Sequence, residues 1–251
     1  MAVERAVLLI ADIGGYTRFM KVHRINLSHA QYVVAQLLEA VIDAAEPRFK
    51  LAKLEGDAAF FYALANKGDH DLTALGEQVA AIRQRFLRRR RELEIDRMCS
   101  CDGCVQASQL TLKFVSHVGE VAFQKVKKLT ELAGVDVIFV HRLLKNGVPI
   151  TEYVLMSEPV HERLAPAVQQ VARESSEELE GLGAMRTYYV DLNDIATIEP
   201  DTRTSSAPRK LVAWAKMCLR SVPYLIGRRE PCEGFRNMDA VTGGAALVPA
   251  K

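Results

Sequence analysis

The sequence lacks several features that would assign a chain to a class at once. No run of 18 apolar residues occurs among its 251 residues, so no segment is expected to cross a bilayer as a helix. Charge of one sign does not dominate, because 33 basic residues stand against 31 acidic ones. The chain therefore has no overall excess of positive charge that would indicate binding to nucleic acid or to an anionic membrane. The chain also has no internal repeat.

No secretory leader is expected at the start of the sequence. Glu4, Arg5 and Asp12 interrupt the first apolar stretch too early for a signal peptide, so we expect a cytoplasmic protein. Hydrophobic residues make up 49% and charged residues 25% of the composition. These are ordinary globular values, which exclude disorder, collagen and coiled coil as a description of the whole chain.

Cysteine is scarce and unevenly placed. The chain has five cysteines, an odd number, and three of them crowd into Cys99-Ser-Cys101-Asp-Gly-Cys104. In a reducing compartment this spacing predicts free thiols or a thiolate site for Zn²⁺ or an iron–sulfur cluster rather than disulfides. A fourth ligand would come from Cys218, Cys232, a histidine or a partner chain. Three free thiols in a tight loop remain the alternative.

Apolar patterns predict a mixed α and β chain. Short apolar runs that end at turn residues favour strands, whereas apolar residues three or four apart favour helices. The expected strands cover residues 6–11, 49–54, 58–64, 110–118, 121–126, 151–157 and 184–192. The expected helices cover 28–45, 71–95 (capped by Asp71), 135–145 and 158–164. Gly119 is predicted to mark a turn between two strands.

Two aspartates occupy positions where strands are predicted to end. Asp12 follows the first strand, and Asp57 lies at the tip of the 49–64 hairpin. Converging carboxylates would make an oxygen-ligand site for Mg²⁺. Next to Asp12, the segment Gly14-Gly15-Tyr16-Thr17 leaves backbone amides open to a phosphate chain. The alternative is that each aspartate serves only as a cap or turn residue.

Several segments resemble, in order, the motifs of class III nucleotide cyclases. The first two are Leu9-Ile-Ala-Asp12-Ile-Gly-Gly-Tyr16-Thr17-Arg-Phe19 and Lys53-Leu-Glu-Gly56-Asp57. Residues 112–121 are similar to the family's strand-His-x-Gly segment, 134–142 to its Gly-x-x-Val-Asn-x-Ala-x-Arg stretch, and 154–158 to its late strand-to-helix step. The resemblance covers about residues 5–192 and is nearest to an uncharacterised bacterial branch that carries the Cys-x-Cys-x-x-Cys insertion.

The resemblance implies a fold and an assembly. The fold would be α+β, with a ferredoxin-like βαββαβ core in which helices pack on an antiparallel sheet. A class III cyclase-like catalytic domain would span residues 1–193, and a linker with a C-terminal helical tail would span 194–251. In this family, metal-binding and base-reading residues of one site come from different chains. A homodimer with shared sites is therefore implied, with strands around 110–126 lining the dimer cleft.

The resemblance also implies an activity, the conversion of ATP to 3′,5′-cyclic AMP and pyrophosphate in signalling. Asp12, Asp57 and the Ile13 carbonyl would hold two Mg²⁺ or Mn²⁺ ions. The backbone amides from Gly14 through Gly15 and Tyr16 to Thr17 would bind the β- and γ-phosphates. Arg142 would neutralise charge on the α-phosphoryl oxygens. Lys53 and Glu131 would contact the base, and Glu131 stands where adenylate cyclases use Asp.

One residue departs from the family pattern. Ile138 replaces the Asn that orients the ribose four residues before Arg142, and the Ile side chain cannot form hydrogen bonds. This leaves two alternatives open, a catalytically degenerate nucleotide-binding or interaction module, and a cyclase for another base. The nearby His141 and the strand residue His117 are interpreted as packing or structural residues.

The tail contains one apolar helical stripe. Leu211, Trp214, Ala215, Cys218 and Leu219 share a face, with Lys and Arg nearby. Such a helix can lie on a membrane surface. Pro223 is predicted to shorten it to about three turns, which favours docking on its own domain or on the dimer partner instead.

Overall fold

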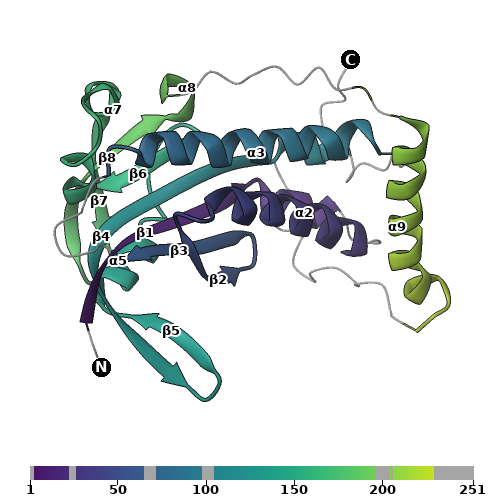
Figure 1. Cartoon of the computed structure of the whole chain (residues 1–251), viewed down its shortest axis with the longest axis horizontal. Helices are drawn as coiled ribbons and strands as arrows, with labels where there is room; N and C mark the ends of the chain where they lie inside the picture. The colour runs from purple at the N-terminus through teal and green to yellow at the C-terminus, as the bar shows by residue number, and fades with distance from the viewer. Residues whose placement is uncertain are drawn as a thin grey trace, which may run out of the picture.

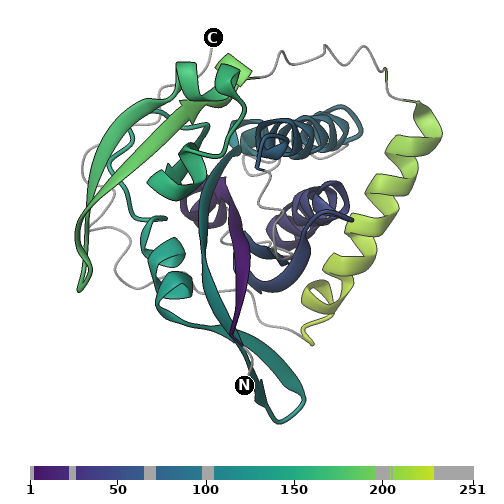
Figure 2. The same ribbon diagram turned by 60° about the vertical axis from the view of Figure 1, so that its left-hand side comes forward.

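The protein forms one mixed sheet with helices on both faces (Figures 1 and 2). The computed structural model describes residues 3–22, 27–64, 72–97, 105–195, 204 and 206–228. The predicted cysteine site at Cys99, Cys101 and Cys104, the possible ligand Cys232 and the predicted cap Asp71 lie outside these residues.

The first half of the chain builds one edge of the sheet and the helices on its first face. The elements, in chain order, are β1 (Val3–Gly14), α1 (Tyr16–Val22), α2 (Leu27–Ala45), β2 (Lys50–Glu55), β3 (Ala58–Leu64) and α3 (Leu75–Ile95). These elements confirm the predicted strands, hairpin and helices, although β1 is longer than the apolar run that predicts it. Helix α3 begins after Ala74, which makes no side-chain cap.

The second half completes the sheet. The elements are η1 (Ala107–Gln109), β4 (Thr111–Val126), β5 (Leu129–Ala133), α5 (Val135–Arg142), β6 (Tyr153–Ser157), α6 (Glu158–His161), α7 (Pro166–Val171), β7 (Arg173–Leu179), β8 (Gly183–Asp191), α8 (Leu192–Ile195) and α9 (Ala207–Leu225). The strand order is β2-β3-β1-β4-β6-β8-β7, and β5 pairs with β4. All pairs are antiparallel except β4–β6. The predicted α+β class is confirmed.

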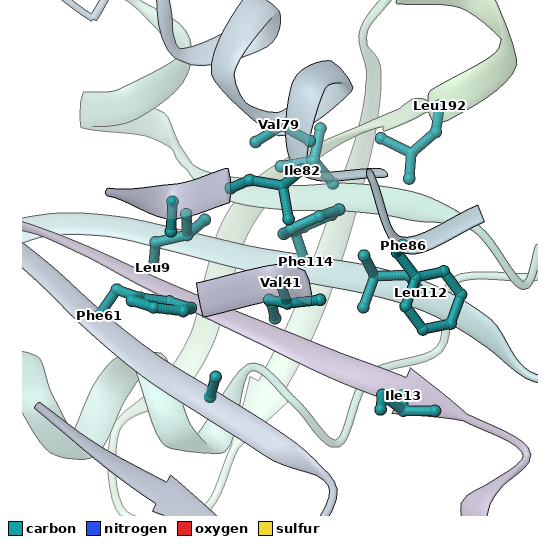
Figure 3. Close-up of a cluster of buried hydrophobic side chains, with 14 of the residues drawn as sticks. Leu9, Ile13, Val41, Phe61, Val79, Ile82, Phe86, Leu112, Phe114 and Leu192 are labelled. Atoms are coloured by element: carbon teal, nitrogen blue, oxygen red, sulfur yellow. The ribbon is translucent and has the colours of Figure 1, made fainter. Parts of the chain in front are cut away.

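Strand β1 lies in the middle of the sheet and is buried on both faces. Its alternate side chains serve two cores, because successive strand residues point to opposite faces. Val7, Leu9, Ala11 and Ile13 pack with α2 and α3, whereas Ala6, Leu8 and Ile10 pack with α5. Figure 3 shows Leu9 and Ile13 in the first core, beside Val41 of α2 and Phe86 of α3. Burial on both faces explains why this strand reads as a continuous apolar run.

The predicted turn at Gly119 is wrong. Residues 111–126 form the single strand β4, in which Gly119 pairs with Ala6 of β1. The chain reverses instead at Lys127, which has a positive φ of 55°, and returns as β5. Gly119 has a different purpose, since an added Cβ would lie 2.2 Å from Cγ of Asp136 on α5. The glycine therefore permits a close helix–strand approach.

The edge strand β7 and the short helix α7 have no counterpart in the predicted elements. The β7 sequence Arg-Glu-Ser-Ser-Glu-Glu-Leu is polar, and most of its residues are at least partly exposed. An edge strand that pairs only with β8 does not need apolar residues on both faces, so it gives no hydrophobic alternation.

Helix α9 is longer than the sequence predicts. It covers 19 residues, and Pro223 lies in its last turn, so the prediction of about three turns is wrong. The helix ends two residues after Pro223, whose ring nitrogen cannot donate to the carbonyl four residues before it. The helix lies beside α2 and the end of α3 (Figures 1 and 2). Among the described helices, none has the length and apolarity needed to span a membrane.

Candidate active site

Asp12 and Asp57 lie at the same end of neighbouring strands. Asp12 is near the end of β1 and pairs with Ala58 of β3, while Asp57 occupies the turn just before β3. The backbone N–H of Ile13 donates to the carbonyl oxygen of Asp57 at 3.2 Å, which ties the turn to the strand. The structure thus brings together the two aspartates that the sequence predicts.

The two carboxylates influence each other electrostatically. Burial raises the pKa of the Asp57 carboxyl above its ordinary value, and the charge of Asp12 raises it further. Lys113 of β4 partly compensates, because its Nζ lies 3.1 Å from Oδ2 of Asp12. Burial, followed by the charge of Asp57, also raises the pKa of Tyr16. A pair of carboxylates held in this way attracts an additional cation.

The donor set at this pair fits a hard divalent cation. Carboxylate oxygens, a backbone carbonyl such as that of Ile13, water and phosphate are the ligands that Mg²⁺ prefers. Within the described ranges, no cluster of three or more His, Cys, Asp or Glu side chains could hold a metal by itself. Any ion at Asp12 and Asp57 would therefore need further oxygen ligands from outside the protein side chains.

The local structure explains why glycine occurs at positions 14 and 15. A Cβ on Gly14 would lie 2.3 Å from Oγ1 of Thr111, so the Thr111 hydroxyl would have to turn away to make room for a side chain there. Gly15 has a φ of +84°, which favours glycine, and its carbonyl accepts a hydrogen bond from Phe19 N–H at 2.9 Å. Helix α1 therefore begins at Tyr16, with Thr17 exposed in its first turn. Phosphate binding by this segment stays a prediction.

A cavity of about 500 Å³ lies on the α5 side of the sheet. Its walls come from β2, from α5 and the residues after it, and from β7 with the turn that follows. The lining residues are Lys53, Val137, Ile138, His141, Arg142, Lys145, Glu178, Leu179 and Glu180. One cavity thus brings together three residues that the sequence analysis singled out, Lys53, Ile138 and Arg142. Asp12 and Asp57 are not among its lining residues.

A hydrogen-bonded network connects β2 to α5 at the cavity. Oε1 of Glu55 lies 2.8 Å from Nζ of Lys53 and 2.9 Å from Nε2 of His141. Nδ1 of His141 lies 2.7 Å from the Val137 carbonyl, to which it donates. Burial of the Glu55 carboxyl opposes ionisation, but the bonds from Lys53 and His141 outweigh it and lower its pKa. The sequence interpretation gave Glu55 no role, although it lies inside the Lys53–Asp57 motif.

Arg142 and Ile138 project from α5 at this cavity. The guanidinium of Arg142 packs against Gly181, where an added Cβ would lie 3.0 Å from its Nη1. Gly181 also has a φ of +72°, which favours glycine in the β7–β8 turn. The Ile138 side chain is 49% exposed although it is apolar. Glu131 does not join them, since it lies on β5 opposite Gln124 and does not line the cavity.

Helix α5 is held to the sheet by His117. This buried residue of β4 contacts Oγ of Ser157 through Nδ1 at 2.8 Å and Oδ1 of Asp136 through Nε2 at 3.0 Å. The second oxygen of Asp136 accepts a hydrogen bond from the Glu120 N–H at 2.6 Å. His117 lies within β4, which continues to Val126 beyond the strand end predicted at residue 118. Its interactions connect three elements and so fix the helix that carries Arg142.

Comparisons with known proteins place the chain in a family. An uncharacterized protein of Mycobacterium tuberculosis (Rv2561/Rv2562) is 44% identical over 220 residues, which is 87% of this chain and 99% of the relative. The chain belongs to the family of this mycobacterial protein. A family model described as a protein of unknown function (DUF2652) matches residues 34–153.

Solved structures show that the chain has the fold of class III nucleotide cyclases. The guanylate cyclase domain of RhGC from Catenaria anguillulae, in complex with GTP, aligns with a TM-score of 0.54 and 14% identity over 76% of this chain and 98% of its own. A class III adenylyl cyclase-like ATP-binding protein from Pseudomonas aeruginosa aligns with a TM-score of 0.53 and 16% sequence identity. The alignment covers 67% of this chain and 36% of that protein. The adenylyl cyclase CyaB from P. aeruginosa aligns with a TM-score of 0.50 and 11% sequence identity. The alignment covers 82% of this chain and 98% of CyaB.

Proposed function

We propose that the protein is a nucleotide cyclase that converts ATP to 3′,5′-cyclic AMP and pyrophosphate. The observation that carries the proposal is the placement of Asp12 and Asp57 at the same end of β1 and β3, where Ile13 N–H bonds to the Asp57 carbonyl, on a cyclase fold. In the reaction, the ribose 3′-oxygen forms a bond to the α-phosphorus, the bond to the bridging oxygen breaks, and the 3′-hydroxyl loses its proton. Pyrophosphate leaves with the electron pair of the broken bond.

Asp12, Asp57 and the Ile13 carbonyl would hold Mg²⁺ or Mn²⁺. Such ions would lower the pKa of the 3′-hydroxyl and bind the triphosphate when present. The chain's own groups position the substrate and neutralise its charge. Arg142 would donate two parallel hydrogen bonds to α-phosphoryl oxygens, and its packing against Gly181 limits the orientations of its guanidinium. Lys53, held by Glu55, would donate to the base.

We further propose that the active site forms between two copies of the chain. Asp12 and Asp57 do not line the cavity that contains Lys53 and Arg142. A twofold dimer would place the aspartates of one protomer against the cavity of its partner, and twofold dimers are the commonest closed assembly. Residues 1–193 would form the catalytic domain, and residues 194–251 would form its linker and tail.

Turnover by the purified protein tests the proposal directly. The protein is incubated with ATP, GTP, CTP or UTP and Mn²⁺, and cyclic nucleotide and pyrophosphate are both quantified. We expect cyclic AMP and pyrophosphate in equal amounts from ATP, and we expect Asp57→Ala to abolish both. Product from another triphosphate would change the base but keep the reaction class. Undiminished turnover by Asp57→Ala would refute the two-carboxylate assignment.

A nucleotide-binding module without turnover is the second candidate. The observation that favours it is the exposed apolar side chain of Ile138 at the cavity, where the family pattern has a hydrogen-bonding Asn. The structural similarity to a cyclase-like ATP-binding protein is consistent with such a function. Calorimetric binding of ATP without formation of any cyclic product would support this candidate over the cyclase.

A further inference from the structure

Helix α9 exposes an apolar stripe. Leu211, Trp214, Leu219, Val222 and the following residue Ile226 are each at least 40% exposed. At 3.6 residues per turn, these positions fall within an arc of about 140° around the helix. A stripe of this width on a surface helix normally faces a core or another apolar phase.

The contact between α9 and the rest of the protein involves another face of the helix. A groove of about 430 Å³ separates α9 from α2 and α3. On the α9 side, this groove is lined by Pro208, Arg209, Val212, Ala213 and Lys216. On the other side it is lined by Tyr32 of α2 and by Arg89, Glu92 and Asp96 of α3 and its end. None of the five stripe residues lines the groove, so among the described parts of the chain the docking of α9 leaves the stripe exposed.

The charge of this segment identifies the kind of surface that would cover the stripe. Residues 207–228 contain five basic residues and no acidic residue, although the whole chain carries a net charge of only +2. A second copy of the helix on the stripe would bring two such basic segments together, and like charges repel. An anionic surface with an apolar interior matches both the charge and the stripe.

We propose that α9 is a membrane-surface helix that binds anionic phospholipids. The apolar stripe would enter the boundary between headgroups and acyl chains, with the helix parallel to the membrane plane. Lys210 lies beside the stripe and would extend to the lipid phosphates. Trp214 suits the interface, because its ring is apolar while its N–H can bond to water or headgroups. This inference does not depend on cyclase activity.

The chain offers a direct probe for this helix, because Trp214 is its single tryptophan. The full-length protein is titrated with phosphatidylglycerol vesicles and with phosphatidylcholine vesicles, and fluorescence and co-sedimentation are recorded. We expect a blue shift of Trp214 emission and co-sedimentation with phosphatidylglycerol only. Both effects are expected to weaken with added salt, since exposed charges are screened.

Matched variants separate this helix from other exposed apolar positions. Leu219→Glu places a negative charge on the stripe, at a side chain that is 72% exposed, and is expected to reduce vesicle binding at least tenfold. Val3→Glu makes the same change at the start of β1, where the side chain is 62% exposed, and is expected to bind as the parent does.

Three results would overturn the proposal. Unchanged Trp214 emission with both vesicle types would mean that the stripe does not enter lipid. A blue shift that grows with protein concentration in the absence of vesicles would show that a second copy covers the stripe. An equal shift with an acidic polypeptide, together with no co-sedimentation, would assign the surface to an acidic protein partner.

Discussion

Ile138 is the residue at which this chain departs from the class III cyclase motif that its sequence resembles, and its position makes the departure testable. The side chain lines the cavity that also contains Arg142, one helical turn away. Because misplacement of a substrate by about 1 Å can reduce a rate about 10²-fold, restoring a hydrogen-bonding side chain here has a large potential effect.

We expect Ile138→Asn to raise kcat for cyclic AMP formation by up to about 10²-fold, because Asn can orient the ribose through hydrogen bonds. The measurement is steady-state turnover with ATP and Mn²⁺. Ile138→Ala is the matched control, since it removes the same apolar side chain without adding a donor or acceptor. Equal turnover by both variants would show that this position does not contact the ribose.

His117 predicts a dependence of stability on pH. Burial lowers the pKa of its imidazole below the ordinary value of 6.5, although Asp136 opposes this shift. The folded protein therefore binds fewer protons here than the unfolded chain once the pH falls below about 6.5. Consequently, the free energy of unfolding is expected to decrease as the pH falls through this range, by at most about 1.4 kcal/mol per pH unit.

Urea unfolding of the parent and of His117→Gln at pH 7.5, 6.5 and 5.5 measures this contribution. We expect the parent to lose more stability than the variant between pH 6.5 and 5.5, because the variant has no imidazole to protonate at this position. Since the other histidines are common to both proteins, the difference between the two slopes isolates residue 117. Parallel slopes would contradict the prediction.

At the scale of elements, the close approach of α5 to β4 predicts the result of a single added methyl group. In Gly119→Ala the new Cβ would meet the Cβ and Cγ of Asp136, at 2.4 Å and 2.2 Å. Asp136 would have to move, which disturbs its bonds to His117 and Glu120. We expect a loss of about 1–3 kcal/mol in stability, as for other overpacked positions, and a lower kcat because α5 carries Arg142.

Gly147→Ala is the control for this substitution. An added Cβ there meets nothing closer than Glu177 at 3.9 Å, so the variant is expected to unfold within about 0.5 kcal/mol of the parent. Chemical denaturation of both variants gives the comparison. A Gly119→Ala protein as stable as Gly147→Ala would mean that the helix does not approach the strand so closely in solution.

The sequence predicts helices and strands well where burial imposes a regular spacing of apolar residues. Strand β1, helix α2 and the β2–β3 hairpin follow directly from apolar runs and a glycine-containing turn. Strand β7 was missed because its polar edge sequence has no such period. Gly119 was misread because a glycine before a second apolar run is typical of a turn. Its true cause, contact with Asp136, joins residues that are distant in the sequence.

The candidate site likewise has parts that the sequence predicts and parts that it does not. Asp12 and Asp57 were predictable, because each occupies a recognisable strand end or turn. The Glu55–His141 contact was not, since it joins residues 86 positions apart. Likewise, nothing in the pattern of residues 173–183 predicts that Gly181 accommodates Arg142. Contacts between elements depend on packing, which a single sequence does not display.

At the scale of the whole molecule, the separation of the aspartates from the cavity predicts complementation between variants. Asp57→Asn and Arg142→Ala are each expected to be inactive as homodimers. In a mixed dimer one of the two shared sites would contain both lesions and the other neither. Random mixing would therefore restore about one quarter of the parent activity, as expected for a twofold dimer with shared sites.

The experiment requires co-expression or co-refolding of the two variants so that protomers exchange, followed by turnover measurement. Two copies of the same variant serve as controls and should stay inactive. Analytical ultracentrifugation of the mixture establishes that dimers are present. Dimers without any recovered activity would contradict a site shared between protomers.

The central position of β1 has a consequence for the order in which this protein is made. The strand is synthesised before both of its neighbours, β3 and β4, and β4 ends only at Val126. A nascent chain that has passed β3 but not β4 would expose one edge of an apolar strand, which is a template for aggregation. Truncated chains ending between residues 64 and 110 should therefore be aggregation-prone. Both edges of β1 can be covered only after β4 has emerged from the ribosome.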